Sequence, residues 1–413
     1  MQAGEKNMNN QASNPTLKLL TYLMFLIFAM TTDAVGVIIP EIIKRYDLTL
    51  TQASTFHYGV MIAMALTGVS LGFLADRYGR KLAIILGLAI FAAACFLFPF
   101  GDDFAYFLCL LLATGVGIGI FKTAALALIG DISSSPKEHT HTMNLAEGYF
   151  GIGAIIGPAI VTYLIHGGLS WVYLYAFAGA SALLLIVIAS LTNYPPKPPV
   201  TNKAPSNWRS AIPIMKDRYA LGFSSAIALY VVVEAGIYVW LPTLLADYDG
   251  SAKWMSIYAL SIFFIFRAAG RFLGAWILDR VRWQTTLTLF TGMIFACYFF
   301  STLFGIEVGV WLLPVSGLFM SVIYPTLNSK GINCFPVSQH GAIAGVILFF
   351  TATAAALGPL MMGVIGDVMG HVSFGFGFAM ISAGLLFAMA IWNQLRDPSK
   401  GRIDELAAVN APT

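Results

Sequence analysis

The sequence predicts an all-α membrane protein with twelve transmembrane helices in two pseudo-symmetric six-helix bundles. Of its 413 residues, 58% are hydrophobic and only 10% are charged, whereas a soluble domain carries about 25% charged residues. The apolar residues gather in twelve long stretches, each near the ~20 residues with which a helix crosses a bilayer. These stretches are continuous rather than alternating, so we expect helices and not the strands of a membrane barrel.

The twelve stretches predict the helices one by one. They cover residues 18–44, 51–75, 82–100, 104–130, 139–165, 170–193, 219–246, 251–278, 284–304, 307–330, 340–367 and 371–395. An even number of spans puts both termini on one side of the membrane. Three of the 23 Lys and Arg residues fall within helices, and three more (Lys44, Arg45 and Lys253) lie in loops opposite the termini. The remaining 17 (23 − 3 − 3) lie in the two tails or in loops on the same side of the membrane as the tails. This excess of basic residues predicts that both termini are cytoplasmic.

The polar segments divide the chain into two halves. We expect a cytoplasmic tail at 1–17, a first bundle at 18–193, a proline-rich linker at 194–218, a second bundle at 219–395 and a tail at 396–413. Similar features recur in both halves. Asp76-Arg77 and Asp279-Arg280 are 203 residues apart, and the Gly-Pro pairs at 157 and 358 are 201 apart, as are Asp33 and Glu234. Such a repeat indicates a duplicated six-helix unit, as in many secondary transporters.

Several classes of function are excluded by what the sequence lacks. A net charge of +3 is too small to recruit a nucleic acid. The chain has no sizeable soluble domain, no nucleophile–base constellation, no metal-ligand spacing and no phosphate-binding loop. We therefore expect that the protein is not an enzyme, that it binds no metal or cofactor, and that it does not use ATP. The expected partners are a small-molecule substrate and the lipid bilayer, with the protein a monomer in a bacterial inner membrane.

The loop after the second predicted helix carries a recognisable motif. It reads Gly72-Phe-Leu-Ala-Asp76-Arg77-Tyr-Gly79-Arg80-Lys81, which resembles the signature of the major facilitator superfamily. The glycines allow a tight turn, and the basic side chains suit a cytoplasmic surface facing anionic headgroups. The resemblance implies the fold predicted above and a loop that switches conformation during transport.

A finer resemblance points to the fucose/galactose/glucose–proton symporters and their sodium-dependent sugar-transporter relatives. It rests on the segments 319–326, 270–276, 144–156 and 233–241. The chain departs from the fucose-symporter pattern at three acidic or amide positions. Gly36 stands where that pattern has the acid of helix 1, with Asp33 one turn earlier. Lys122 stands in place of an acid, and Glu147 in place of an amide, so the proton route of that symporter does not transfer to this chain.

Ionisable residues within predicted spans mark a candidate coupling site. A charge at the bilayer centre costs on the order of 2.5–3.5 kcal/mol on insertion scales, so such residues face a partner or a cavity. Helix counting places Lys122 and Glu147 at one depth, and Glu234 and Arg267 at another shared depth. Asp33 lies near the midplane, as a third member of the first group or as an independent site. These five residues either couple transport to protons or sodium ions, or form structural ion pairs, as Arg271 also could.

Polar and aromatic residues at similar depth are candidates for a sugar site, because hydroxyls need polar partners and sugar rings stack on aromatic faces. They are Asn144, Tyr149, Tyr230, Tyr238, Trp240, Tyr324 and Asn328. Tyr238 and Trp240 equally fit an aromatic belt at the membrane interface. The sequence thus predicts cation-coupled symport of a small polar solute, a monosaccharide in the first place, by alternating access. The alternative is a proton-coupled drug or metabolite exporter of the same superfamily.

Overall fold

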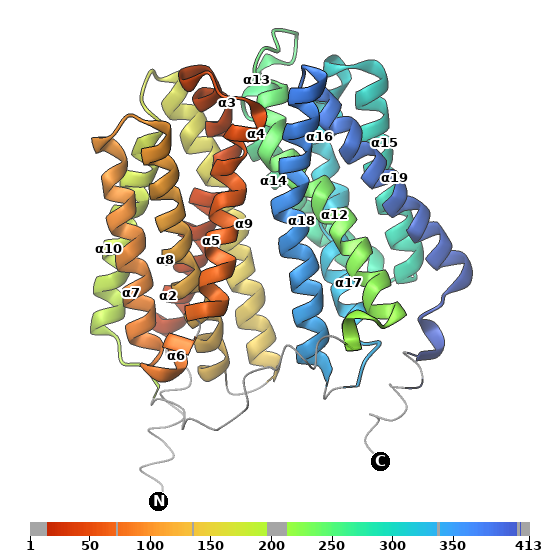
Figure 1. The fold of residues 1–413 in the computed structure, drawn as a ribbon. Helices are drawn as coiled ribbons and strands as arrows, with labels where there is room; N and C mark the ends of the chain where they lie inside the picture. Colours follow the sequence, from red (N-terminus) through yellow and green to blue (C-terminus); the bar gives the residue numbers. More distant parts are fainter. Residues whose placement is uncertain are drawn as a thin grey trace, which may run out of the picture. The chain divides into compact units, whose positions relative to one another are not determined.

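The computed structural model describes residues 15–71, 73–133, 136–195, 213–336, 339–402 and 405. Throughout these ranges the regular secondary structure is helical, which confirms the predicted fold class. The chain divides into two compact units, each a bundle of helices lying side by side (Figure 1). Unit 1 comprises Met1–Leu48 and Thr55–Thr201, and unit 2 comprises Thr49–Ser54 and Asn202–Thr413.

Unit 1 holds the helices coloured red to yellow-green in Figure 1. They are α2 (Pro15–Thr32), α3 (Val35–Tyr46), α5 (Thr55–Leu71), α6 (Phe73–Arg77), α7 (Arg80–Leu97), the short 3₁₀ helix η1 (Phe98–Phe100), α8 (Phe104–Asp131), α9 (Pro136–His166) and α10 (Val172–Leu191). The helix pairs with the most extensive contacts are α7 with α8, α2 with α9, and α5 with α8.

Unit 2 holds the helices coloured green to blue, together with one short helix from earlier in the chain. They are α4 (Leu50–Ala53), α12 (Arg218–Leu244), α13 (Lys253–Ile257), α14 (Ala259–Leu278), α15 (Trp283–Phe304), α16 (Ile306–Met320), α17 (Ile323–Ile332), α18 (His340–Met369) and α19 (Ser373–Arg396). Most of the predicted linker, residues 196–212, lies outside the described residues.

Eleven helical spans in the described ranges are long and apolar enough to cross a membrane. The remaining predicted span, 51–75, corresponds to α5 and α6, which flank residue 72, a position outside the described residues. Residues 51–53 of the predicted span belong instead to α4, which ends before α5 begins, and Thr49 and Gln52 form a reciprocal capping box at the start of α4. Asp367 of α18 then accepts hydrogen bonds from the backbone N–H groups of Leu50 (2.7 Å) and Thr51 (2.8 Å). A carboxylate at a helix N-terminus is stabilising, and it fixes α4 within unit 2.

Two of the eleven long apolar spans contain a break, and a proline follows each break. The first span breaks at Asp33–Ala34, between α2 and α3, and another breaks at Ser321–Val322, between α16 and α17. A proline has no N–H to donate to the carbonyl four residues before it, and its ring crowds that carbonyl. Pro40 acts in this way on Gly36, and Pro325 on Ser321. Each interruption frees backbone groups near the middle of a membrane span.

Glycines bring specific helix pairs into close contact. A Cβ added at Gly157 of α9 would lie 2.1 Å from the carbonyl oxygen of Met30 in α2, and one at Gly153 would lie 2.2 Å from that of Leu26. In unit 2, a Cβ at Gly270 of α14 would lie 2.1 Å from the carbonyl oxygen of Leu318 in α16. Small residues let helix backbones approach in membranes. These contacts bring neighbouring helices against both interrupted spans.

Candidate functional site

Asp33 occupies the interruption of the first span. Its backbone N–H still donates to the carbonyl of Ala29 at 3.0 Å, but Val37 donates to Ala34 at 3.0 Å, three residues back rather than four. The chain therefore tightens for one turn directly after Asp33. The residue is half-buried, which places a carboxylate and locally irregular backbone together. Interrupted helices build ion and substrate sites in several transporter folds.

Lys122 projects from the middle of α8 toward this region. Its Nζ lies 4.2 Å from the centre of the Phe28 ring, a cation–π contact with α2. The carboxylates of Glu147 and Asp33 are both close enough to act electrostatically on this ammonium group. In the part of the chain that the structure describes, Lys122 and Glu147 do not form a direct ion pair. Their pairing stays a prediction, and in this conformation the aromatic ring is the contact that supports Lys122.

The pairing of α2 with α9 fixes the levels of these groups. Lys18 and Glu138 form an ion pair of 2.6 Å near the starts of the two helices, so the helices run in the same direction. Tyr149, a predicted substrate-binding residue, stacks on Tyr22 with ring centres 5.3 Å apart. Glu147 therefore lies near the level of Tyr22, on the order of 15 Å along the helix from Asp33. Lys122, over Phe28, stands between the levels of the two carboxylates.

The predicted substrate residue Asn144 lies on the same helix as Glu147 and is exposed. The structure thus places Asn144, Glu147 and Tyr149 within about two turns of α9. Their side chains differ in exposure, and only Tyr149 has a ring partner on α2.

Unit 2 contains the second charged cluster, and there the charges touch. Arg267 of α14 donates from Nη2 to Glu234 Oε1 of α12 at 2.7 Å, so the predicted depth match corresponds to a real ion pair. The hydroxyl of Tyr230 lies 2.7 Å from the same Oε1 and 2.9 Å from the carbonyl oxygen of Met320. That hydroxyl has one proton and two acceptors beside it. Met320 is the last residue of α16, so the tyrosine ties the ion pair to the interrupted helix.

The other predicted substrate residues of unit 2 are spread out. Trp240 is fully buried, and its Nε1–H donates to the carbonyl of Pro359 at 2.9 Å, so it packs α12 against α18 rather than facing the membrane interface. Tyr238 is half-buried on α12. Tyr324 and Asn328 are half-buried on α17, four residues apart and therefore on one helix face. Tyr230 contacts the charged cluster directly, through its hydroxyl beside Glu234.

The loop after α5 is described in part. Gly72 lies outside the described residues, and for Asp76 only the backbone, in α6, is described. Gly79 has φ +95°, a conformation that favours glycine, and it leads into α7. Arg80 forms an ion pair of 2.8 Å with Asp131 at the end of α8. Lys81 donates to the carbonyls of Ser190 (2.7 Å) and Thr192 (3.2 Å) at the end of α10, while Arg77 lies exposed over the Tyr78 ring. The loop therefore joins three helix ends of unit 1.

Two contributors to the clusters were not predicted from the sequence. Phe28 supports Lys122, and the backbone carbonyl of Met320 accepts from Tyr230. Pro325, one turn beyond the break between α16 and α17, is the sequence feature that could have indicated the contribution of the Met320 carbonyl. Nothing in the local sequence marks Phe28 among the 31 phenylalanines of the chain.

Two bundles of apolar helices with charged residues inside their spans are typical of secondary transporters. The family model described as Major Facilitator Superfamily matches residues 21–359. The chain belongs to the major facilitator superfamily. It is an integral membrane transporter and not an enzyme.

Named relatives are similar over most of the chain. A Bacillus subtilis (strain 168) protein named as a niacin/nicotinamide transporter, NiaP, is 22% identical over 379 residues, covering 89% of this chain and 92% of its own. A glucose/galactose transporter of Brucella abortus biovar 1 (strain 9-941) is 22% identical over 367 residues, covering 85% and 88%. The crystal structure of FucP in the outward conformation matches with a TM-score of 0.62 and 21% identity, covering 91% of this chain and 98% of that one. This structural likeness shows the fold.

Proposed function

We propose that this protein is a secondary active transporter that imports a small polar solute, with a monosaccharide as the first candidate, by symport with a proton or a sodium ion. The observation that carries the proposal is the position of Lys122. Its ammonium lies over Phe28 within electrostatic reach of Asp33 and Glu147. These two carboxylates lie on different helices and at different levels of unit 1.

This arrangement supports coupling because the ammonium group of Lys122 interacts electrostatically with two carboxylates, those of Asp33 and Glu147. A buried ammonium needs an anionic or aromatic partner to offset the cost of leaving water. When a proton or a sodium ion neutralises one carboxylate, the attraction of Lys122 toward the other increases in relative terms. Binding of the coupling ion thereby changes which helix holds Lys122. A ligand shifts a conformational equilibrium only through such differential interactions.

A sugar is the first candidate substrate for two reasons. One relative is named as a glucose/galactose transporter at 22% identity. The predicted site residues also combine hydroxyl and amide groups with aromatic rings, the chemistry that sugars require. Tyr324 and Asn328, on one face of α17 beyond its interruption, are the residues of unit 2 that we assign to this role.

A small aromatic carboxylate is the second candidate substrate. The relative named for niacin/nicotinamide transport has the same 22% identity over a slightly longer alignment. A carboxylate substrate would itself provide an anion for Lys122, whereas a sugar would not. Removal of the Lys122 charge should therefore weaken the equilibrium binding of a carboxylate substrate, whereas for a sugar it should impair accumulation and leave binding nearly unchanged.

The remaining features follow from the sequence pattern. We assign the protein to a bacterial inner membrane with both termini in the cytoplasm, on the basis of its 17 basic residues beside the termini. We expect it to act as a monomer without a cofactor other than the coupling ion. Its expected partners are the transported solute and the surrounding lipid.

The proposal is tested by uptake into proteoliposomes with proton and sodium gradients imposed separately. The solutes are radiolabelled glucose, galactose, fucose and niacin, one at a time. We expect one of the sugars to accumulate above its outside concentration only when one inward ion gradient is present. Accumulation of niacin alone, lost in Lys122→Gln, would replace the first candidate by the second. Solute entry driven only by an outward ion gradient would show antiport and overturn the proposal.

A further inference from the structure

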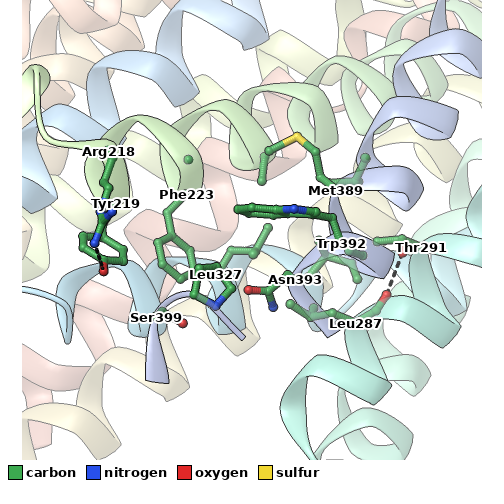
Figure 2. A pocket seen from close by; sticks show the side chains of 16 residues that line it. Arg218, Tyr219, Phe223, Leu287, Thr291, Leu327, Met389, Trp392, Asn393 and Ser399 are labelled. Carbon is green, nitrogen blue, oxygen red and sulfur yellow. Dashed lines mark hydrogen bonds between the residues drawn. The ribbon is translucent and has the colours of Figure 1, made fainter. Parts of the chain in front are cut away.

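Unit 2 contains a cavity of about 460 Å³ that the transport proposal does not use. It lies between α12, α15, α17 and α19, and its walls are mainly apolar. Figure 2 shows Phe223, Leu327 and Trp392 around its middle, with Met389 above them. The volume falls within the range of pockets that hold small ligands.

One end of the cavity is cationic. Arg218, the first residue of α12, lies there beside Tyr219, to whose hydroxyl it donates at 2.8 Å (Figure 2). The adjoining segments 216–218 and 396–402 contain five basic residues and two acidic ones. Arg402 pairs with Asp217 at 3.6 Å, and Asp397 accepts a hydrogen bond from Gln284 at 2.8 Å. Both acids are thus already engaged, and a positive excess surrounds the mouth of an apolar cavity.

A buried hydroxyl also lines the cavity. Ser399 is 1% exposed, and its Oγ has no hydrogen-bond partner within the described part of the chain. An unpaired buried hydroxyl is energetically unfavourable. An occupant with a hydrogen-bonding head group would satisfy it. The hydroxyl lies toward the same side of the cavity as Asn393 in Figure 2.

The cavity has an exposed border beside the ends of two predicted membrane spans. Its lining comes from the first turns of α12 and the last turns of α19, so it lies near one membrane surface rather than at the middle of the spans. Trp392, which borders it, is 58% exposed. Tryptophan beside basic residues is typical of the headgroup region of a bilayer. An occupant could therefore enter sideways from the membrane.

We propose that this cavity binds one acyl chain of an anionic phospholipid, whose phosphate is held by Arg218 and Ser399. The apolar walls match a hydrocarbon chain, and the cationic mouth matches a negative headgroup. Basic pockets between helices at a membrane surface bind anionic lipid headgroups for the same reason. A small polar solute fits these walls poorly, so the site is separate from the transported substrate.

The test measures lipid binding to the purified, delipidated full-length protein by native mass spectrometry. The probes are phosphatidylglycerol and phosphatidylcholine of equal chain length, with inorganic phosphate as a competitor. We expect phosphatidylglycerol to bind about fivefold more tightly than phosphatidylcholine, the effect of roughly one basic residue at a membrane surface. Phosphate should not displace it, because the acyl chain contributes most of the binding.

Two variants separate the headgroup from the chain. Arg218→Gln should remove the preference for phosphatidylglycerol and weaken phosphatidylcholine binding much less, because the choline cation of that lipid already opposes the arginine. Gly222 lines the cavity, and a Cβ there meets open space, so Gly222→Ala and Gly222→Leu fill the cavity progressively without a backbone clash. They should weaken both lipids in that order. The matched controls are Gly377→Leu, where a Cβ also meets open space but outside the cavity, and Arg280→Gln, an exposed arginine elsewhere in unit 2.

Three results would overturn the inference. These are unchanged binding of both lipids by Gly222→Leu, a retained phosphatidylglycerol preference in Arg218→Gln, or equal losses in the control variants. Folding is checked by the thermal unfolding midpoint of each variant. If Gly222→Leu fails to fold, Gly222→Ala and Arg218→Gln still decide the outcome, because each addresses one half of the proposed ligand.

Discussion

The two charged clusters of this protein are built from similar residues but are held differently. In unit 2, Glu234 and Arg267 are in direct contact at 2.7 Å, and Tyr230 joins the same carboxylate oxygen. In unit 1, Lys122 rests on the ring of Phe28, and its two candidate acids act on it from a longer range. Short bonds hold the cluster of unit 2 together, whereas in unit 1 the ammonium group of Lys122 can interact with either of two carboxylates.

This difference separates two roles that the sequence alone left open. A closed buried pair holds its helices together, and breaking it strands a charge in a medium of low dielectric. A cation supported by an aromatic face can move between acids at a smaller cost. We therefore expect substitutions in unit 2 to act mainly on stability and those in unit 1 mainly on coupling.

The largest expected effect is the loss of stability when the closed pair is broken. Arg267→Met leaves Glu234 without its cation, and removal of one partner of a buried pair costs about 3–5 kcal/mol. The midpoint of thermal unfolding of the purified protein should fall sharply. Tyr230→Phe should cost less, about 1–2 kcal/mol, because it removes hydrogen bonds but no charge.

The control for this prediction is an exposed pair of the same unit. Lys253 and Asp249 also form a short ion pair, but their side chains are 60% and 82% exposed. Water screens such a pair, so Asp249→Asn should leave the unfolding midpoint unchanged. Equal shifts for Arg267→Met and Asp249→Asn would show that closure of the buried cluster does not matter.

The next effect concerns Asp33 and is expected in transport rather than in stability. Asp33→Asn preserves the shape of the side chain but removes its charge at the interrupted helix. We predict that accumulation against a gradient is abolished, while exchange of labelled for unlabelled solute persists. The measurement is concentrative uptake beside counterflow in proteoliposomes. Wild-type accumulation by Asp33→Asn would remove this residue from the coupling mechanism, and an unfolded product would instead assign it a structural role.

The features that were predictable from the sequence are those set by local pattern. Hydropathy located the helices, and the count of residues from each helix end placed Glu234 and Arg267 at one depth, where they do form a pair. Gly153 and Gly157 are four residues apart, a spacing typical of close helix packing in membranes, and they lie against the backbone of α2. Periodicity and length decide these features before any tertiary contact forms.

The features that were not predictable depend on which helix faces meet. Depth matched Lys122 with Glu147 as well, yet depth cannot say whether a side chain points to a neighbour or past it. In the structure Lys122 lies over Phe28, between the levels of Glu147 and Asp33, and α8 packs mainly on α7 and α5. Likewise, Thr49–Ser54 belongs to unit 2 although its neighbours in the sequence belong to unit 1. Its bonds to Asp367 span more than 300 residues, and no local pattern indicates them.

A double-mutant cycle on Lys122 and Glu147 sharpens the interpretation of the open cluster. If the two charges depend on one another, Lys122→Ala and Glu147→Ala each impair uptake, and the double variant recovers part of the loss. Interacting residues show coupling energies of about 0.5–3 kcal/mol. We expect a value near the lower limit, because no direct ion pair is seen between them within the described residues. Strictly additive losses in the uptake rate would reject the interaction.

A modest effect is expected at an ion pair of unit 1 that is in direct contact. This pair tests whether direct contact or location in unit 1 determines the outcome. Arg80 and Asp131 pair at 2.8 Å with side chains 13% and 21% exposed, and they join the ends of α7 and α8 far from Asp33. Asp131→Asn should lower stability by about 1–2 kcal/mol, between the values for exposed and buried pairs.

Asp131→Asn should also lower the maximal uptake rate, because Asp131 pairs with Arg80 of the loop after α5. It should leave the half-saturating solute concentration unchanged. Its control is Asp102→Asn, which breaks the more exposed ion pair with Arg45 in the same unit and should change neither quantity. If Asp131→Asn uncoupled uptake in the manner expected of Asp33→Asn, location in unit 1 would determine the effect. A loss of stability with coupling intact would show instead that the closure of a pair, in either unit, is what makes it structural.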